Sequence, residues 1–201
     1  MTERFAFALL AVLLLTAAAA AQRAPRFSEA QLDAKLKRCE ALLAQGNALQ
    51  ALRASVPTGQ ALFDEYSFDF DRWEELSNRG RSVAWTAVVR LRGAYDVKGN
   101  RAKDPRAVLR TAEERQRELL DEGNPDWNAR HAESLVALGD RMQDAYDALA
   151  PLHEDGKLRE PETYAALATA ARALGHTEFA SVAQARCIAL AKARAKRTCG
   201  S

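Results

Sequence analysis

A short pattern recurs three times in this chain of 201 residues and constrains its fold more than any other feature. Each copy has a Leu-rich stretch, a Gly, a polar residue and an Ala that begins a second apolar stripe. A Leu-rich stretch at helical spacing predicts a helix, and the Gly permits a tight turn before the next helix. The pattern predicts helix–turn–helix units within residues 41–52 (ALLAQGNALQAL), 136–149 (VALGDRMQDAYDAL) and 172–183 (RALGHTEFASVA).

Composition also indicates an all-α fold. Beyond residue 21 the chain is rich in Ala, Leu, Arg, Glu and Gln, which favour helices, and poor in Val, Ile and Thr outside one segment. That segment, residues 82–95 (SVAWTAVVRLRGAY), alternates apolar and polar side chains as a strand does. A lone strand would leave its backbone groups without partners, so we expect a helix here too.

Periodicity and punctuation locate the individual helices. A first helix is expected to begin after the N-cap candidate Ser28 and to end at residues 45–47, and a second, short helix is expected to stop at Pro57. Pro105 is well placed in the first turn of a later helix. The apolar stripe of the first helix consists of Leu32, Leu36, Cys39 and Leu43.

Residues 161–191 resemble the tetratricopeptide repeat in their spacing of small and large side chains. The matching residues are Tyr164, Leu167, Ala168, Ala171, Gly175, Ala180 and Cys187. The resemblance implies stacked antiparallel helix hairpins that expose a concave groove for a peptide or a protein. The alternative is an irregular helical bundle, because one continuous apolar stripe runs from Leu135 to Leu149 straight through Gly139.

The N-terminus predicts export. Phe5–Ala21 is an uninterrupted apolar run that ends in small residues, as a secretory signal peptide does. We expect a signal peptide at residues 1–21 and a single α-helical domain at residues 22–201, periplasmic or extracellular, with no membrane span after signal removal. An uncleaved N-terminal anchor is the alternative. A lipid anchor is not expected, because the nearest cysteine is Cys39.

The charge balance excludes one class of partner. The chain has 29 Lys and Arg against 27 Asp and Glu, a net charge of +2, so we expect no nucleic-acid partner. The basic residues near the C-terminus project in several directions on a helix, and they complement the negative end of the helix dipole. An arm that binds an anionic polymer or lipid is the alternative. These residues are Arg186, Lys192, Arg194, Lys196 and Arg197.

The expected function is that of a protein-interaction scaffold or binding module, with an unknown protein or peptide as partner. Residues 63–76 (FDEYSFDFDRWEEL) concentrate five aromatic side chains and six carboxylates, which suits a basic, apolar segment. Phe68, Asp69 and Asp71 are the partner-binding candidates. The competing interpretation is that the aromatic residues belong to the core, because four of them share one helical stripe with Leu76, namely Phe63, Tyr66, Phe70 and Trp73.

Catalysis is not expected, and no catalytic, cofactor-binding or metal-binding residue is assigned. Glu133 followed by Ser134 resembles the acid of lytic transglycosylases, so a lysozyme-like, glycan-cleaving enzyme using Glu133 is the alternative function. Its companion Gly-rich segment with Met and Gln is missing. His131, His153 and His176 are too widely spaced to form a metal-binding motif.

The three cysteines predict a disulfide in an oxidising compartment. A continuous helix would hold Cys187 and Cys199 about 18 Å apart, well beyond the ~7 Å that a disulfide spans. Cys39 and Cys187 lie on core-facing stripes, so a Cys39–Cys187 bond is expected, with Cys39–Cys199 as the competitor. An open helical array, whose ends are far apart, would forbid both bonds.

Overall fold

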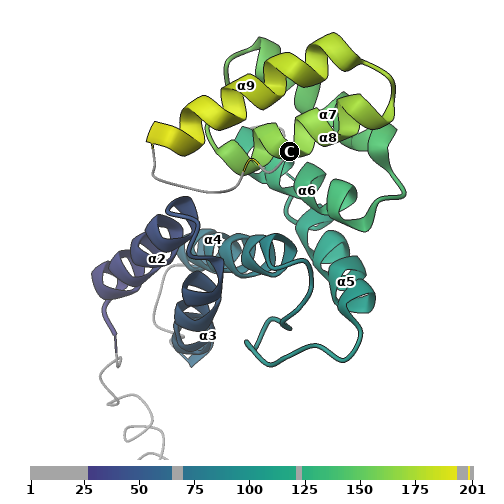
Figure 1. Cartoon of the computed structure of the whole chain (residues 1–201). Coiled ribbons are helices and arrows are strands. Elements are labelled where there is room, and N and C mark those ends of the chain that lie inside the picture. Colours follow the sequence, from purple (N-terminus) through teal and green to yellow (C-terminus); the bar gives the residue numbers. More distant parts are fainter. Residues whose placement is uncertain (1–26, 65–69, 121–123, 194–198, 200–201) are drawn as a thin grey trace, which may run out of the picture.

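The computed structural model describes residues 27–64, 70–120, 124–193 and 199, and within these residues the fold is all-α (Figure 1). The fold class predicted from the sequence is confirmed, and most of the ambiguous segment 82–95 lies in a helix. The predicted signal peptide lies outside the described residues. The helices of the described ranges are α2 (Glu29–Ala44), α3 (Ala48–Asp64), α4 (Phe70–Arg90), α5 (Pro105–Arg117), α6 (Pro125–Leu138), α7 (Met142–Glu154), α8 (Pro161–Ala173) and α9 (Thr177–Ala193).

The helices stack in chain order. Helices α2, α4, α6 and α8 form a row in which each contacts the next, while α3, α5 and α7 pack against their sequence neighbours. Among the described helices, α9 packs along α8 and touches α7 through the ring of Phe179, and the first pair, α2 and α3, has no contact with the last pair, α8 and α9. Figure 1 shows α2–α4 at one end of the molecule and α7–α9 at the other. The array is therefore open.

Each of the three predicted helix–turn–helix units is present. Gly46, Gly139 and Gly175 follow helix ends and have positive φ angles of 81°, 84° and 83°, a backbone conformation that favours glycine. The alternative interpretation, in which one helix runs continuously through Gly139, is wrong, because α6 ends at Leu138 and α7 begins at Met142. The resemblance to the tetratricopeptide family itself stays a prediction.

Helix ends follow the sequence signals at most positions, with one exception. Ser28 caps α2 in a capping box with Gln31, and Asp104 caps α5 ahead of Pro105. The expected stop at Pro57 is wrong, because α3 continues to Asp64. Buried side chains at helical spacing continue on both sides of the proline, so packing outweighs the lost backbone hydrogen bond. They are Ala48, Ala51, Leu52, Ser55 and Thr58.

The aromatic stripe of residues 63–76 is interrupted, because α4 begins at Phe70. Leu76 is buried as expected, whereas the Phe70 side chain is 70% exposed, so its assignment to the core is wrong. Successive steps of three residues from Leu76 back to Phe70 rotate the side chain by about 120° on a helix, away from the core-facing stripe. The side chains of Phe63 and Tyr66 lie outside the described residues.

The cysteine pairing also differs from the expected one. Cys187 is bonded to Cys199, their Cα atoms are 5.9 Å apart, and Cys39 is a buried free thiol. The expected Cys39–Cys187 bond is wrong because α2 and α9 have no contact with each other. The continuous helix to Cys199 is wrong as well, because α9 ends at Ala193 and Cys199 lies beside Cys187.

A candidate binding groove

A groove of about 650 Å³ opens where the two halves of the array meet. Its walls come from the turn before α3 and the start of α3, the end of α4, and one face each of α6 and α8. Three helices of the central row thus contribute to it. Its volume lies in the range of ligand sites. The lining residues are Gly46, Asn47, Ala48, Leu49, Gln50, Val89, Arg90, Leu91, Arg92, Glu133, Val136, Ala137, Glu162, Ala165, Ala166 and Thr169.

A buried ion-pair cluster forms the floor of the groove. Arg90, the last residue of α4, has a side chain only 7% exposed. It donates from Nε to Glu133 Oε2 at 3.0 Å and from Nη2 to Glu133 Oε1 at 2.9 Å. The same Nη2 also donates to Glu160, which precedes α8. Arg90 therefore connects the N-terminal helices to both α6 and α8.

Further charged groups extend the cluster. Arg130 donates to Glu160 Oε1 at 3.2 Å and to Ser82 Oγ at 3.1 Å. Glu162 Oε2 lies 3.8 Å from Arg90 Nη1. Three carboxylates thus surround two guanidinium groups, and the cluster carries one excess negative charge when all are ionised. Paired hydrogen bonds of this kind are what makes buried charge tolerable.

The pKa shifts in the cluster reflect burial and opposing charge. Burial raises the pKa of Glu133, and the charge of Arg90 only partly offsets this. Burial also acts to raise the pKa of Glu160, but Arg90 and Arg130 outweigh it and hold that pKa below its ordinary range. Burial disfavours the charge of Arg90, but the carboxylates of Glu133 and Glu160 outweigh this and raise its pKa.

Above this charged floor the groove is lined mainly by apolar side chains. Leu49, Leu91, Val136 and Ala165 are half-buried, so each keeps part of its surface open to the groove. Arg92 is exposed and adds a positive charge beside them. An apolar lining with a few fixed polar groups is the usual composition of a binding site, in which the apolar part supplies affinity and the polar groups set orientation.

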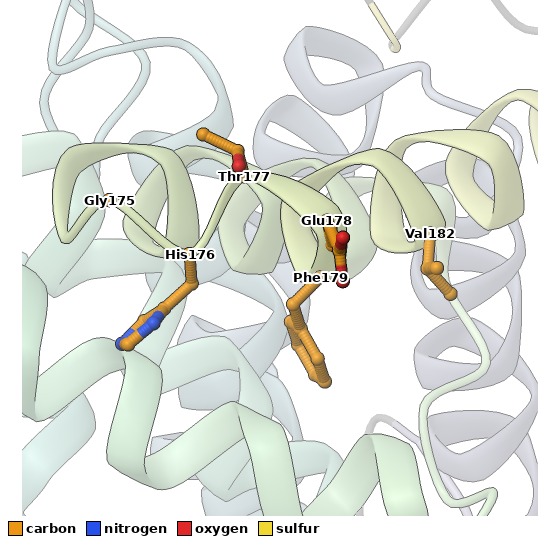
Figure 2. A pocket seen from close by; sticks show the side chains of 6 residues that line it. All are labelled: Gly175, His176, Thr177, Glu178, Phe179 and Val182. Carbon is orange, nitrogen blue, oxygen red and sulfur yellow. The ribbon is translucent and has the colours of Figure 1, made fainter.

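A second hollow, of about 600 Å³, lies at the start of α9 (Figure 2). Almost all of its wall comes from one helix and the turn before it, so it does not enclose a ligand as the groove does. Figure 2 shows the side chains of Phe179 and Val182 projecting to the same side of α9. The lining residues are Gly175, His176, Thr177, Glu178, Phe179 and Val182.

The three histidines take part in packing and hydrogen bonding. His176 stacks on Tyr146 at 4.9 Å between ring centroids, and His153 meets Phe179 edge to face at 5.4 Å. His131 is buried, and its Nε2 lies 3.0 Å from Glu113 Oε1. In the part of the chain that the structure describes, no group of three His, Cys, Asp or Glu side chains is arranged to hold a metal ion.

The candidate residues from the sequence do not converge on the groove. Asp71 is exposed in the first turn of α4, next to the exposed Phe70, while Phe68 and Asp69 lie outside the described residues. Glu133 does line the groove, but both of its carboxylate oxygens accept hydrogen bonds from Arg90.

Sequence reasoning missed the residues that build the groove floor. Arg90 is 70 residues from Glu160 and 72 from Glu162 in the chain, and each of the three reads as an ordinary surface charge. One signal was present, because Arg90 stands within the apolar stretch of residues 82–95, where an unpaired charge would be costly to bury. The partners themselves follow only from the packing of α4 against α6 and α6 against α8.

Comparison of the chain with family models, with curated proteins and with solved structures finds no match. The described helices also include none with the length and hydropathy needed to cross a membrane.

Proposed function

We propose that this protein is an exported binding module that holds an apolar segment of a partner protein in the groove between its two halves. The observation that carries the proposal is the groove itself, because three helices of the central row and the start of α3 converge on it. Its apolar lining would bury side chains of the segment, and its polar groups would orient the segment's backbone.

Two features support export. The apolar run at residues 5–21 has the pattern of a signal peptide, and the Cys187–Cys199 disulfide is typical of proteins from oxidising compartments. Intact-mass analysis of the exported protein should give an N-terminus within a few residues of Gln22. A mature protein that begins at Met1 and fractionates with membrane would contradict export.

The binding function is tested with a displayed library of twelve-residue peptides and a variant that fills the groove. Ala165→Arg places a long side chain among the groove residues, while Ala34→Arg makes the same change on an exposed position of α2. Peptides enriched on the wild-type protein should bind Ala34→Arg equally and Ala165→Arg at least about tenfold more weakly, which is 1.4 kcal/mol.

The outcome that would overturn the binding function is equally definite. If no peptide is enriched on the wild-type protein, or if enriched peptides bind Ala165→Arg as tightly as Ala34→Arg, the groove is not a peptide site. Circular dichroism and thermal melting of both variants establish that each retains the helical fold.

A glycan-cleaving enzyme using Glu133 is the second candidate. One observation favours it, because Glu133 lines the groove and burial raises its pKa, as a general acid requires. The bidentate contact with Arg90 argues against it, since that contact holds Glu133 as an ion-pair partner. We expect no fragments from peptidoglycan incubated with the protein; release abolished by Glu133→Gln would reverse the ranking.

A further inference from the structure

The last helix of the array has an unpartnered outer face. Among the described helices α9 packs along α8 and touches α7 only at its first turn, through Phe179, and its buried residues, Ala180, Ala183, Cys187 and Ala191, all lie on the side facing α8. A terminal helix of a stacked array usually has a polar outer surface, because nothing covers it. The outer face of α9 departs from that expectation.

Five exposed residues form a seam along this face. They are separated by four, three, four and three residues, which is the spacing that brings side chains to one stripe of a coiled coil. The three central residues are apolar, and Val182 is 51% exposed. The members of the seam are Glu178, Val182, Ala185, Ala189 and Lys192.

The charges at the two ends of the seam select an orientation. Glu178 and Lys192 each lie seven residues from Ala185, one acidic and one basic. Within the described residues neither forms an ion pair. If two copies of α9 pair in antiparallel orientation about Ala185, Glu178 of each copy lies level with Lys192 of the other. In parallel orientation, like charges would lie level with each other.

We propose that α9 pairs with α9 of a second copy of this chain, antiparallel and with the two-fold axis at Ala185. The alanines at the centre let the helix axes approach closely, and opposite charges meet at both ends. The hollow beside Glu178 and Val182 leaves room for the other copy's Lys192 side chain (Figure 2). Cys187 holds Cys199 on the opposite side of α9, so the disulfide does not cover the seam.

The size of the contact sets its strength. A helix of 17 residues is about 25 Å long, so one helix pair buries less surface than a standard protein interface of about 1,600 Å². The dimer is therefore weak and forms as the protein concentration rises. It does not rest on the proposed peptide function, because none of the five seam residues lines the groove.

Charge reversal tests the pairing directly. Sedimentation equilibrium of the full, oxidised chain at about 50 mM salt should show a monomer–dimer equilibrium for the wild type. Glu178→Lys and Lys192→Glu should each raise the dimer dissociation constant about tenfold, because both ends then oppose like charges. The double variant should restore the wild-type constant, since both pairs reform with their signs exchanged.

A matched control separates the seam from net charge. Glu114→Lys makes the same charge change on an exposed position of α5 and should leave the dissociation constant unchanged. A wild-type chain that stays monomeric at millimolar concentration overturns the proposal. So does a double variant as monomeric as the single ones, because a dimer that loses affinity without charge rescue does not use this seam in this orientation.

Discussion

The two ends of the array are held together in different ways. At the N-terminal end, large side chains such as Leu32, Leu36 and Leu43 fill the core, and Arg79 of α4 reaches Asp33 and Glu40 of α2 at 2.7 and 3.0 Å. At the C-terminal end the core is mostly alanine, which lets α8 and α9 approach closely, and a disulfide ties Cys199, which follows α9, to Cys187 of that helix. The outermost helices of the two ends, α2 and α3 at one and α8 and α9 at the other, have no contact with each other.

Because the two ends are built differently, the junction between them, where α4, α6 and α8 meet at the ion-pair cluster, determines how they are held together. The ion-pair cluster on the groove floor joins α4 of the N-terminal end to α6 and to the start of α8 by hydrogen bonds between charged side chains. The same residues that fix the spacing of α4, α6 and α8 therefore fix the shape of the groove.

The largest loss of stability is expected from removing Arg90, the central cation of the ion-pair cluster. Arg90→Ala would leave the carboxylates of Glu133 and Glu160 buried with much of their countercharge gone, at a cost of about 3–5 kcal/mol in the free energy of unfolding. Urea denaturation measures this. Arg106→Ala is the control, because Arg106 is 61% exposed and meets Asp140 only at 3.5 Å, so less than about 1 kcal/mol is expected. Equal losses in both variants would mean that the junction cluster adds nothing.

The second prediction concerns the cysteines. Cys199→Ser opens the twelve-residue loop to Cys187 and should lower the free energy of unfolding by about 3 kcal/mol, whereas Cys39→Ala, with no bond to lose, should cost about 1 kcal/mol. Non-reducing peptide mapping should recover the Cys187–Cys199 link. Alkylation of Cys39 should require denaturant, since burial raises the pKa of its thiol. If Cys39→Ala lowers the free energy of unfolding more than Cys199→Ser does, Cys39 and not Cys199 takes part in the disulfide.

Capping and turn residues in the sequence predict the ends of several helices, and Pro57 shows the limit of such local signals. Ser28, Gly46, Gly139 and Gly175 act on their own neighbours, so the helix ends and turns could be predicted from them. The helix end expected at Pro57 is wrong, because the cost of a proline inside a helix competes with the packing of α3 against α2 and α4. That packing depends on residues far from Pro57 in the sequence.

The groove and the disulfide depend on contacts between distant parts of the chain. Arg90 and Glu160 are 70 residues apart, and their pairing follows only once the helices are placed in their row. Cys187 and Cys199 are close in sequence, but continuous helix geometry made their bond look impossible. Helix propensity favours a continuous helix from Cys187 to Cys199, and the 5.9 Å between their Cα atoms excludes it.

The third prediction concerns how the stability of each region depends on pH. Hydrogen bonds from Lys37 and Arg79 lower the pKa of Asp33 to about 2, below its unfolded value, so this stabilisation is complete above about pH 4 and is lost as pH falls toward 2. Asp33→Asn should therefore cost about 1 kcal/mol at pH 7, allowing for solvent screening, and nothing near pH 2. Urea titrations across this range measure it; a cost that is independent of pH would contradict the ion pair.

Glu133 in the ion-pair cluster should affect stability in the opposite sense, with its unfavourable contribution growing as pH rises. Burial raises its folded pKa above the unfolded value, so its ionisation works against folding as pH rises, and protonation relieves that cost. The penalty of Arg90→Ala should accordingly shrink as pH falls from 7 to 4. A penalty that grows over this interval would mean that the carboxylates left behind are not the source of the instability.

The smallest effect is expected at Phe70, where the N-terminal region departs from its own sequence pattern. The ring is 70% exposed and lies 6.1 Å from Trp73 between centroids, so Phe70→Ala should change the free energy of unfolding by less than about 0.5 kcal/mol. Leu76→Ala, six residues further along α4 and fully buried, should cost about 3 kcal/mol. If Phe70→Ala is instead as damaging as Leu76→Ala, the aromatic residues at the start of α4 belong to the core after all. With the small cost, the exposed ring beside Asp71 stays available to a partner, and peptide binding in the groove should be the same in Phe70→Ala as in the wild type.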